Sequence, residues 1–78
     1  MPTVLRSGPY RVFFFSEEGH EPPHVHVERG GAVAKFWLGP VRTAGNSGFR
    51  AHEMTRIRRM LEQREARLQE AWNAFFGP

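Results

Sequence analysis

The sequence contains no cysteine and no aspartate, and Lys35 is its single lysine. Without cysteine it has neither a disulfide framework nor a thiolate metal site. This composition fits a reducing compartment, so we expect a cytoplasmic protein. No apolar run approaches the roughly 20 residues that a membrane-spanning helix needs, and residues 1–6 lack the apolar core of a signal peptide. We therefore expect no association with a membrane.

The sequence that remains is short and rich in arginine. Seventy-eight residues predict a single small α+β domain at 1–78, with a modest core that a partner protein or a homo-oligomer would help to stabilise. The formal net charge is +3, and all cationic residues except Lys35 are arginine. Because the planar guanidinium suits phosphate and carboxylate groups, RNA and an acidic protein are both compatible partners. The net charge is too small to require either of them.

Three strands are expected in the first half of the chain. Aromatic and β-branched residues at 10–15 predict the first, after an irregular lead-in at 5–9. Gly30-Gly31 predicts a tight hairpin that places His24 opposite Trp37 and His26 opposite Lys35. In this register one face of the hairpin is apolar and carries Val25, Val27, Ala34, Phe36 and Leu38. Gly39-Pro40 ends the third strand, and 41–48 is predicted to be a loop.

The second half of the chain has a helical pattern. Between Phe49 and Phe76, apolar residues recur at steps of three or four, and the pattern is broken at Arg64-Glu65. It predicts one long helix or a helical hairpin, capped by Ser47 or a neighbour and ended by Gly77-Pro78. The predicted fold class is α+β, a three-stranded antiparallel sheet with the helix or hairpin packed on one face. The expected contacts join Val25, Val27, Phe36 and Leu38 of the sheet to Ile57, Leu61 and Leu68.

The segment from Glu21 to Gly31 is the candidate site. Side chains alternate between the two faces of a strand, so His24, His26 and Glu28 lie opposite Val25 and Val27. We expect this histidine-bearing face to be open to solvent, with Lys35 and Trp37 beside the two imidazoles. Pro22 and Pro23 fix an extended backbone before the strand.

The histidine-bearing face has three interpretations. Metal-free acid/base chemistry on RNA would use His24, His26 and Lys35 as catalytic residues, and Trp37, Glu28 and Arg29 to bind the substrate. A metal site would use His20, His24 and His26, with Glu28 as a further ligand, although this spacing matches no zinc motif. The third interpretation is a polar outer face of a small sheet. The residues do not decide whether the protein is an enzyme, and we expect no cofactor.

Several pieces of the sequence together resemble a bacterial family, domain of unknown function 4160. The matching pieces are 1–5, 8–10, 13–15, 21–27, 34–38 and the arginine-rich helix that ends in Trp72 and 75–77. The resemblance implies a small protein partner in a toxin–antitoxin-like pair, and a role directed at RNA or translation. It implies no catalytic residues. The expected functions are a toxin-like component acting on RNA, a non-enzymatic antitoxin-like or adaptor module, and a small metal-binding protein.

Overall fold

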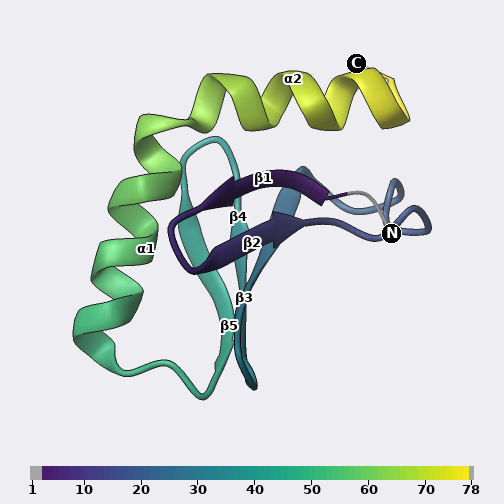
Figure 1. The fold of residues 1–78 in the computed structure, drawn as a ribbon. Coiled ribbons are helices and arrows are strands. Elements are labelled where there is room, and N and C mark those ends of the chain that lie inside the picture. Colours follow the sequence, from purple (N-terminus) through teal and green to yellow (C-terminus); the bar gives the residue numbers. More distant parts are fainter. Residues whose placement is uncertain (1–2, 78) are drawn as a thin grey trace.

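The computed structural model describes residues 3–77, which form an antiparallel sheet and two C-terminal helices (Figure 1). The five strands are consecutive neighbours, in the order β1-β2-β3-β4-β5. The elements are β1 (Thr3–Ser7), β2 (Tyr10–Phe13), β3 (His24–Arg29), β4 (Ala32–Trp37), β5 (Arg42–Ser47), α1 (Ala51–Gln63) and α2 (Glu65–Phe76).

The central hairpin has the predicted register. His24 pairs with Trp37, His26 with Lys35, and Arg29 with Ala32 next to the turn. Gly30 has a φ of 59°, a left-handed conformation that glycine adopts without steric cost. One face of the hairpin is therefore buried in the core, while the histidine-bearing face lies on the other side of the sheet.

The prediction of three strands was wrong, because the sheet has an additional strand at each edge. Residues 3–7 pair with β2 through the Gly8-Pro9 turn, and residues 42–47 pair with β4. The β5 segment is almost wholly exposed and carries no alternating apolar pattern. An edge strand needs main-chain hydrogen bonds on one side and is commonly polar, so its sequence resembles a loop.

The helical half of the chain consists of two helices joined at Arg64. In Figure 1, α1 runs along one side of the sheet and α2 crosses above it. Ile57, Leu61 and Leu68 are fully buried and share one core cluster with the sheet residues, which confirms the predicted helix–sheet contacts. This cluster consists of Leu5, Tyr10, Val12, Val25, Val27, Ala32, Ala34, Phe36, Leu38, Val41, Phe49, Ile57, Leu61 and Leu68.

The helix ends differ in part from the prediction. The N-cap of α1 is Arg50, without a side-chain cap hydrogen bond, so Ser47 does not cap it. The side chain of Asn46 instead bonds both the N–H and the carbonyl of Phe49 and holds the approach to α1. Gly77 ends α2 with a φ of 94°, as predicted, whereas Pro78 lies outside the described residues. No helix within residues 3–77 is long and apolar enough to cross a membrane.

Candidate functional site

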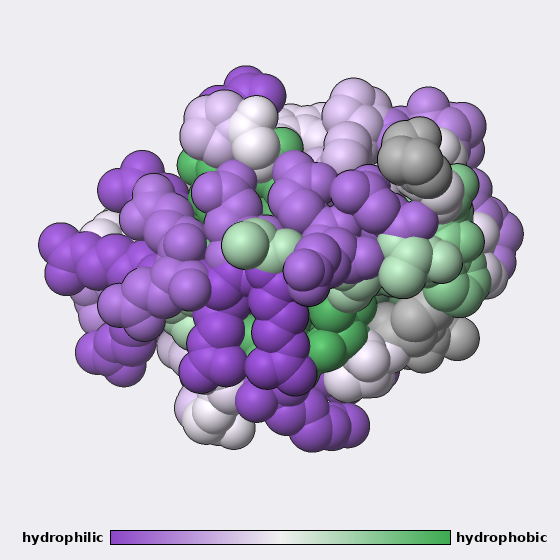
Figure 2. Space-filling model, turned by 90° about the horizontal axis from the view of Figure 1, so that it is seen from above, coloured by the Kyte–Doolittle hydropathy of each residue, from purple (hydrophilic) through white to green (hydrophobic). Residues whose placement is uncertain are grey.

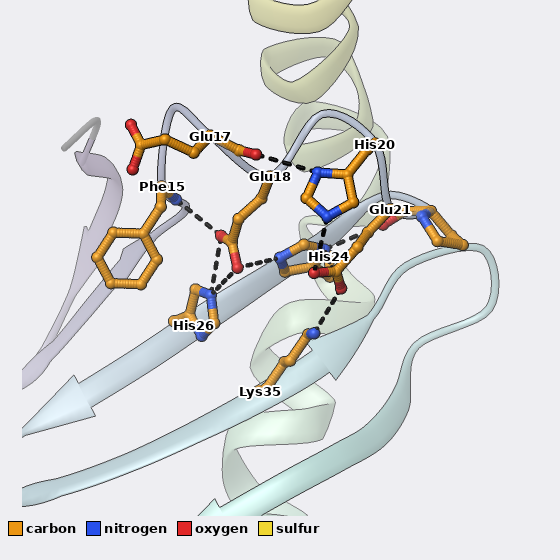
Figure 3. A network of polar contacts seen from close by, with 9 residues as sticks. Phe15, Glu17, Glu18, His20, Glu21, His24, His26 and Lys35 are labelled. Atoms are coloured by element: carbon orange, nitrogen blue, oxygen red, sulfur yellow. Dashed lines mark hydrogen bonds and ion pairs between the residues drawn. The ribbon is translucent and has the colours of Figure 1, made fainter.

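The β2–β3 loop, residues 14–23, folds back over the histidine-bearing face of the sheet (Figure 3). His24 has no exposed surface, and the side chain of His26 is 13% exposed. The expectation of an open face was therefore wrong for His24. The reason is that α2 covers its ring with Trp72, at a centroid distance of 5.0 Å, while the loop closes the other side.

Glu18 lies at the centre of the contacts made by the two histidines. Its Oε2 is 3.0 Å from Nε2 of His24, and Nε2 of His26 is 3.0 Å from both of its carboxylate oxygens. Figure 3 shows both imidazoles directed at this carboxylate. The side-chain donor atoms of the three residues lie within 4.8 Å of one another. We call Glu18, His24 and His26 the Glu-His-His cluster.

His24 is fixed in orientation by the proline pair that precedes it. Its Nδ1 lies 3.0 Å from the carbonyl oxygen of Pro22, and because a carbonyl only accepts, Nδ1 carries the hydrogen. The carbonyl of Pro23 accepts a bond of 2.9 Å from the N–H of Leu38. The proline pair therefore places two carbonyl groups at the start of β3. Nε2 of His24 is left buried without a hydrogen bond, although it lies within ion-pair distance of Glu18.

The carboxylate of Glu18 is itself held in place by the loop. The N–H of Phe15 donates to its Oε1 at 2.9 Å, and the N–H of Glu18 donates to the Phe15 carbonyl at 3.2 Å. Burial raises the pKa of Glu18, but the Phe15 amide and the contacts with His26 and His24 outweigh burial and lower the pKa below its ordinary value. Glu18 is therefore ionised at neutral pH.

Aromatic rings surround both imidazoles. The His26 ring stacks on Phe13 at 5.4 Å and meets the edge of Phe15 at 5.1 Å. The His24 ring meets Trp37 edge-on at 5.6 Å, in addition to Trp72. This apolar surround fixes the ring positions and strengthens electrostatic interactions within the cluster.

The remaining residues of the predicted site engage other partners. Lys35 donates to Glu21 at 2.7 Å and lies 4.5 Å from the centre of the Trp37 ring. Its ammonium lowers the pKa of Glu21.

Glu28, Arg29 and His20 lie outside the Glu-His-His cluster. Glu28 pairs with Arg11 at 3.0 Å, and Arg29 makes two bonds to Glu53 of α1. The side chain of His20 is 75% exposed. Of the residues in the metal interpretation, His24 and His26 therefore lie together with Glu18, whereas His20 and Glu28 lie apart from them.

Glu18 was missed because it belongs to a loop that shows no periodic pattern. The signal in the sequence was the length of the connection between β2 and β3. These strands are neighbours in an antiparallel sheet, where hairpin loops have about 2–5 residues, but the connection spans residues 14–23. A long loop between paired strands has to pack on something, and here it packs on the histidine-bearing face.

A sequence profile described as a domain of unknown function, DUF4160, matches residues 10–73, most of the chain. The chain belongs to this family. No curated protein and no solved structure matches it.

The DUF4160 chain has a second charged feature, formed by arginines that make no ion pair within residues 3–77, although the charge of Arg56 helps to lower the pKa of Glu53. Within residues 3–77, Arg11 and Arg29 form ion pairs, and the other eight arginines form none. Those eight are Arg6, Arg42, Arg50, Arg56, Arg58, Arg59, Arg64 and Arg67. At 3.6 residues per turn, Arg56 and Arg59 share the outer face of α1 with His52, and all three are exposed. Hydrophilic side chains fill the α1 side of the surface shown in Figure 2.

Proposed function

We propose that this DUF4160 protein is the RNA-binding, toxin-like component of a two-protein module. The observation that carries the RNA-binding part of the proposal is the set of eight arginines that form no ion pair within residues 3–77. The charged groups of the sheet largely neutralise one another, as in the pairs of Arg11 with Glu28 and Lys35 with Glu21. Residues 51–76 carry five arginines and four glutamates, so an anionic partner would meet individual guanidinium groups there, at positions where they form no ion pair.

RNA fits this surface better than an acidic protein does, because the cationic residues are arginines and because they are distributed over several elements. Guanidinium groups make two-point contacts with phosphate and stack on bases, which ammonium groups do not. The exposed arginines come from both edge strands and both helices, which suits a chain of phosphates more than a compact acidic patch. Binding of this kind depends steeply on salt.

The histidines are not placed for the acid/base chemistry that was one of their three interpretations. A metal-free ribonuclease needs two imidazoles that reach one phosphate. His24 has no exposed surface, and the Nε2 atoms of both His24 and His26 face Glu18. The geometry therefore favours RNA binding by arginine over acid/base cleavage by two free imidazoles.

The test is a titration of a fluorescein-labelled single-stranded RNA with the protein, followed by anisotropy at several salt concentrations. We expect affinity to fall as salt rises, by about 0.7 log units per tenfold salt for each phosphate contacted. Arg56→Gln/Arg59→Gln should weaken binding by about tenfold and flatten the salt dependence. The comparison variant, Arg6→Gln/Arg42→Gln, removes the same charge from the two opposite edges of the sheet, and it should weaken binding less because its two charges are not neighbours. No salt-dependent binding by the wild type contradicts the proposal, and an equal loss in both variants contradicts a leading role for α1.

The same three proteins test the toxin-like role when expressed in a bacterial host. The wild type should slow growth, and Arg56→Gln/Arg59→Gln should do so less, at equal soluble yield. Unimpaired growth with the wild type contradicts the toxin-like role, while RNA binding is judged separately by the titration.

A further inference from the structure

The hydrogens of the Glu-His-His cluster do not match its acceptors. Nδ1 of His24 donates to the Pro22 carbonyl, so in the neutral ring Nε2 carries a lone pair. This lone pair lies 3.0 Å from a carboxylate oxygen of Glu18, and the oxygens of a carboxylate only accept hydrogen bonds. Two acceptors at this distance repel each other unless a positive charge lies between them. A buried polar atom without a partner costs free energy, and Nε2 of His24 is such an atom.

We infer that Glu18, His24 and His26 bind one divalent transition-metal ion through a carboxylate oxygen and the two Nε2 atoms. The ion satisfies the buried lone pair of His24 and the charge of Glu18 together. It is coordinated by two imidazoles and one carboxylate, a donor set used by zinc and by non-haem iron(II).

The distances in the cluster suit a shared ion. Nitrogen and oxygen ligands lie about 2.0–2.2 Å from zinc, so two donors on one tetrahedral ion are separated by roughly 3.4 Å. The carboxylate of Glu18 lies 3.0 Å from Nε2 of each histidine. Since all the donors lie within 4.8 Å of one another, small side-chain shifts complete the coordination.

The surroundings of the cluster are those that metal ligands usually have. Metal-binding histidines commonly donate their second ring nitrogen to a carbonyl, and ligand carboxylates accept a further hydrogen bond. His24 does the first through Pro22, and Glu18 does the second through the N–H of Phe15. These bonds set the tautomer of His24 and orient the carboxylate before any ion arrives.

Three protein ligands leave at least one coordination position for water or another ligand. The cluster is not sealed, because the side chains of Glu18 and His26 are 16% and 13% exposed. The inferred site is therefore an open one. Its existence does not depend on RNA binding, and binding of the ion is measured without RNA.

The experiment uses tag-free protein, stripped with EDTA and dialysed, then titrated with Zn²⁺ by calorimetry and with Co²⁺ by visible absorption. We expect one ion per chain, and cobalt bands typical of nitrogen and oxygen ligands. Loss of an outer partner commonly lowers metal affinity about 10–100-fold, so removal of a direct ligand, by Glu18→Gln or His26→Ala, should lower it by about 100-fold or more. Circular dichroism checks that each variant is folded.

Two control variants separate the cluster from ordinary surface binding. Glu17→Gln removes the neighbouring exposed carboxylate, and His20→Ala removes the exposed imidazole. Both should bind within about threefold of the wild type, because neither residue belongs to the cluster. The inference is overturned if the wild type binds no stoichiometric ion, if Glu18→Gln binds as tightly as the wild type, or if His20→Ala loses as much affinity as His26→Ala.

Discussion

Glu18 and Glu53 both reach side chains of β3 from neighbouring segments, Glu18 from the β2–β3 loop and Glu53 from α1. Glu53 accepts two hydrogen bonds from Arg29, at 2.6 and 2.9 Å, and a third from the Tyr10 hydroxyl at 2.8 Å. Every one of these partners is a donor that carries a hydrogen. The partners of Glu18 on the sheet are imidazoles, and one of them faces it with a nitrogen that has no hydrogen bond.

The difference shows how a structural ion pair is told from an incomplete site. The Glu53 contacts are complete in themselves, and they fasten α1 to the sheet. The Glu18 contacts need a further proton or cation before Nε2 of His24 has a partner. This is so although the Glu-His-His cluster is more buried than the Arg29–Glu53 pair and is enclosed by aromatic rings. A cluster that destabilises the protein when no ion is bound to it is commonly retained because it has a function.

The most direct way to break this comparison is to replace each glutamate by glutamine, which removes the same charge at each position. In metal-free protein we expect Glu18→Gln to raise the free energy of unfolding by about 1 kcal/mol, since the new amide donates to Nε2 of His24. Glu53→Gln should lower it, because Arg29 loses a charged acceptor. Urea unfolding in EDTA measures both changes.

The opposite outcome is equally informative. If Glu18→Gln destabilises the protein more than Glu53→Gln does, His24 carries a proton on both nitrogens and pairs with Glu18 as a cation. The two glutamates would then be equivalent structural pairs, and the reason to infer a metal ion at Glu18 would disappear.

A smaller effect is expected where the β2–β3 loop meets α2. A Cβ atom on Gly19 would overlap the ring of Phe76, so Gly19→Ala should cost about 1 kcal/mol, as overpacking does. The substitution also shifts the loop that carries Glu18, and we expect weaker Zn²⁺ binding but no change in the Arg29–Glu53 contacts. Calorimetric titration with Zn²⁺ and urea unfolding measure the two effects.

Gly45 provides the matched control for Gly19. A Cβ atom at Gly45 meets nothing within 4 Å, so Gly45→Ala should leave both stability and metal affinity close to those of the wild type. If Gly19→Ala leaves the Zn²⁺ affinity unchanged, the packing against Phe76 does not position Glu18.

The sequence predicted the parts of the fold that depend on local pattern. The Gly30-Gly31 turn and the alternation of Val25 and Val27 with the histidines set the hairpin register, because a slip of one residue would expose the apolar face. The break at Arg64-Glu65 left one long helix and two shorter helices as alternatives, and the chain forms two helices joined at Arg64. The edge strands β1 and β5 were missed, since main-chain pairing at an edge requires no apolar pattern.

The candidate site was predicted in part. His24 and His26 were identified because two imidazoles on one face of a strand are not needed for strand stability. Their surroundings depend on long-range packing, which a single sequence does not reveal. Trp72 covers His24 from α2, and Glu18 reaches both histidines only because the loop folds back over the sheet.

The smallest expected effect concerns the acid stability of the Glu53 contacts. Hydrogen bonds from Arg29 and Tyr10 lower the pKa of Glu53 from 4.5 to about 2. Because the pKa is lower in the folded state, the ionised carboxylate contributes stability above pH 4.5, and this contribution is lost as the pH falls through about 2. Arg29→Gln removes the largest cause of the lowered pKa. The variant should therefore lose less stability between these pH values than the wild type does.

Urea unfolding midpoints from about pH 7 down to about pH 2 measure this difference. Arg6→Gln is the control, since Arg6 forms no ion pair within residues 3–77, and it should keep the pH dependence of the wild type. The difference between Arg29→Gln and the wild type should also shrink in high salt, because the pair is partly exposed and screened. Identical pH profiles for Arg29→Gln and the wild type would mean that Glu53 is not held by Arg29 in solution. The hydroxyl of Tyr10 would then be the one donor that still distinguishes the surroundings of Glu53 from those of Glu18.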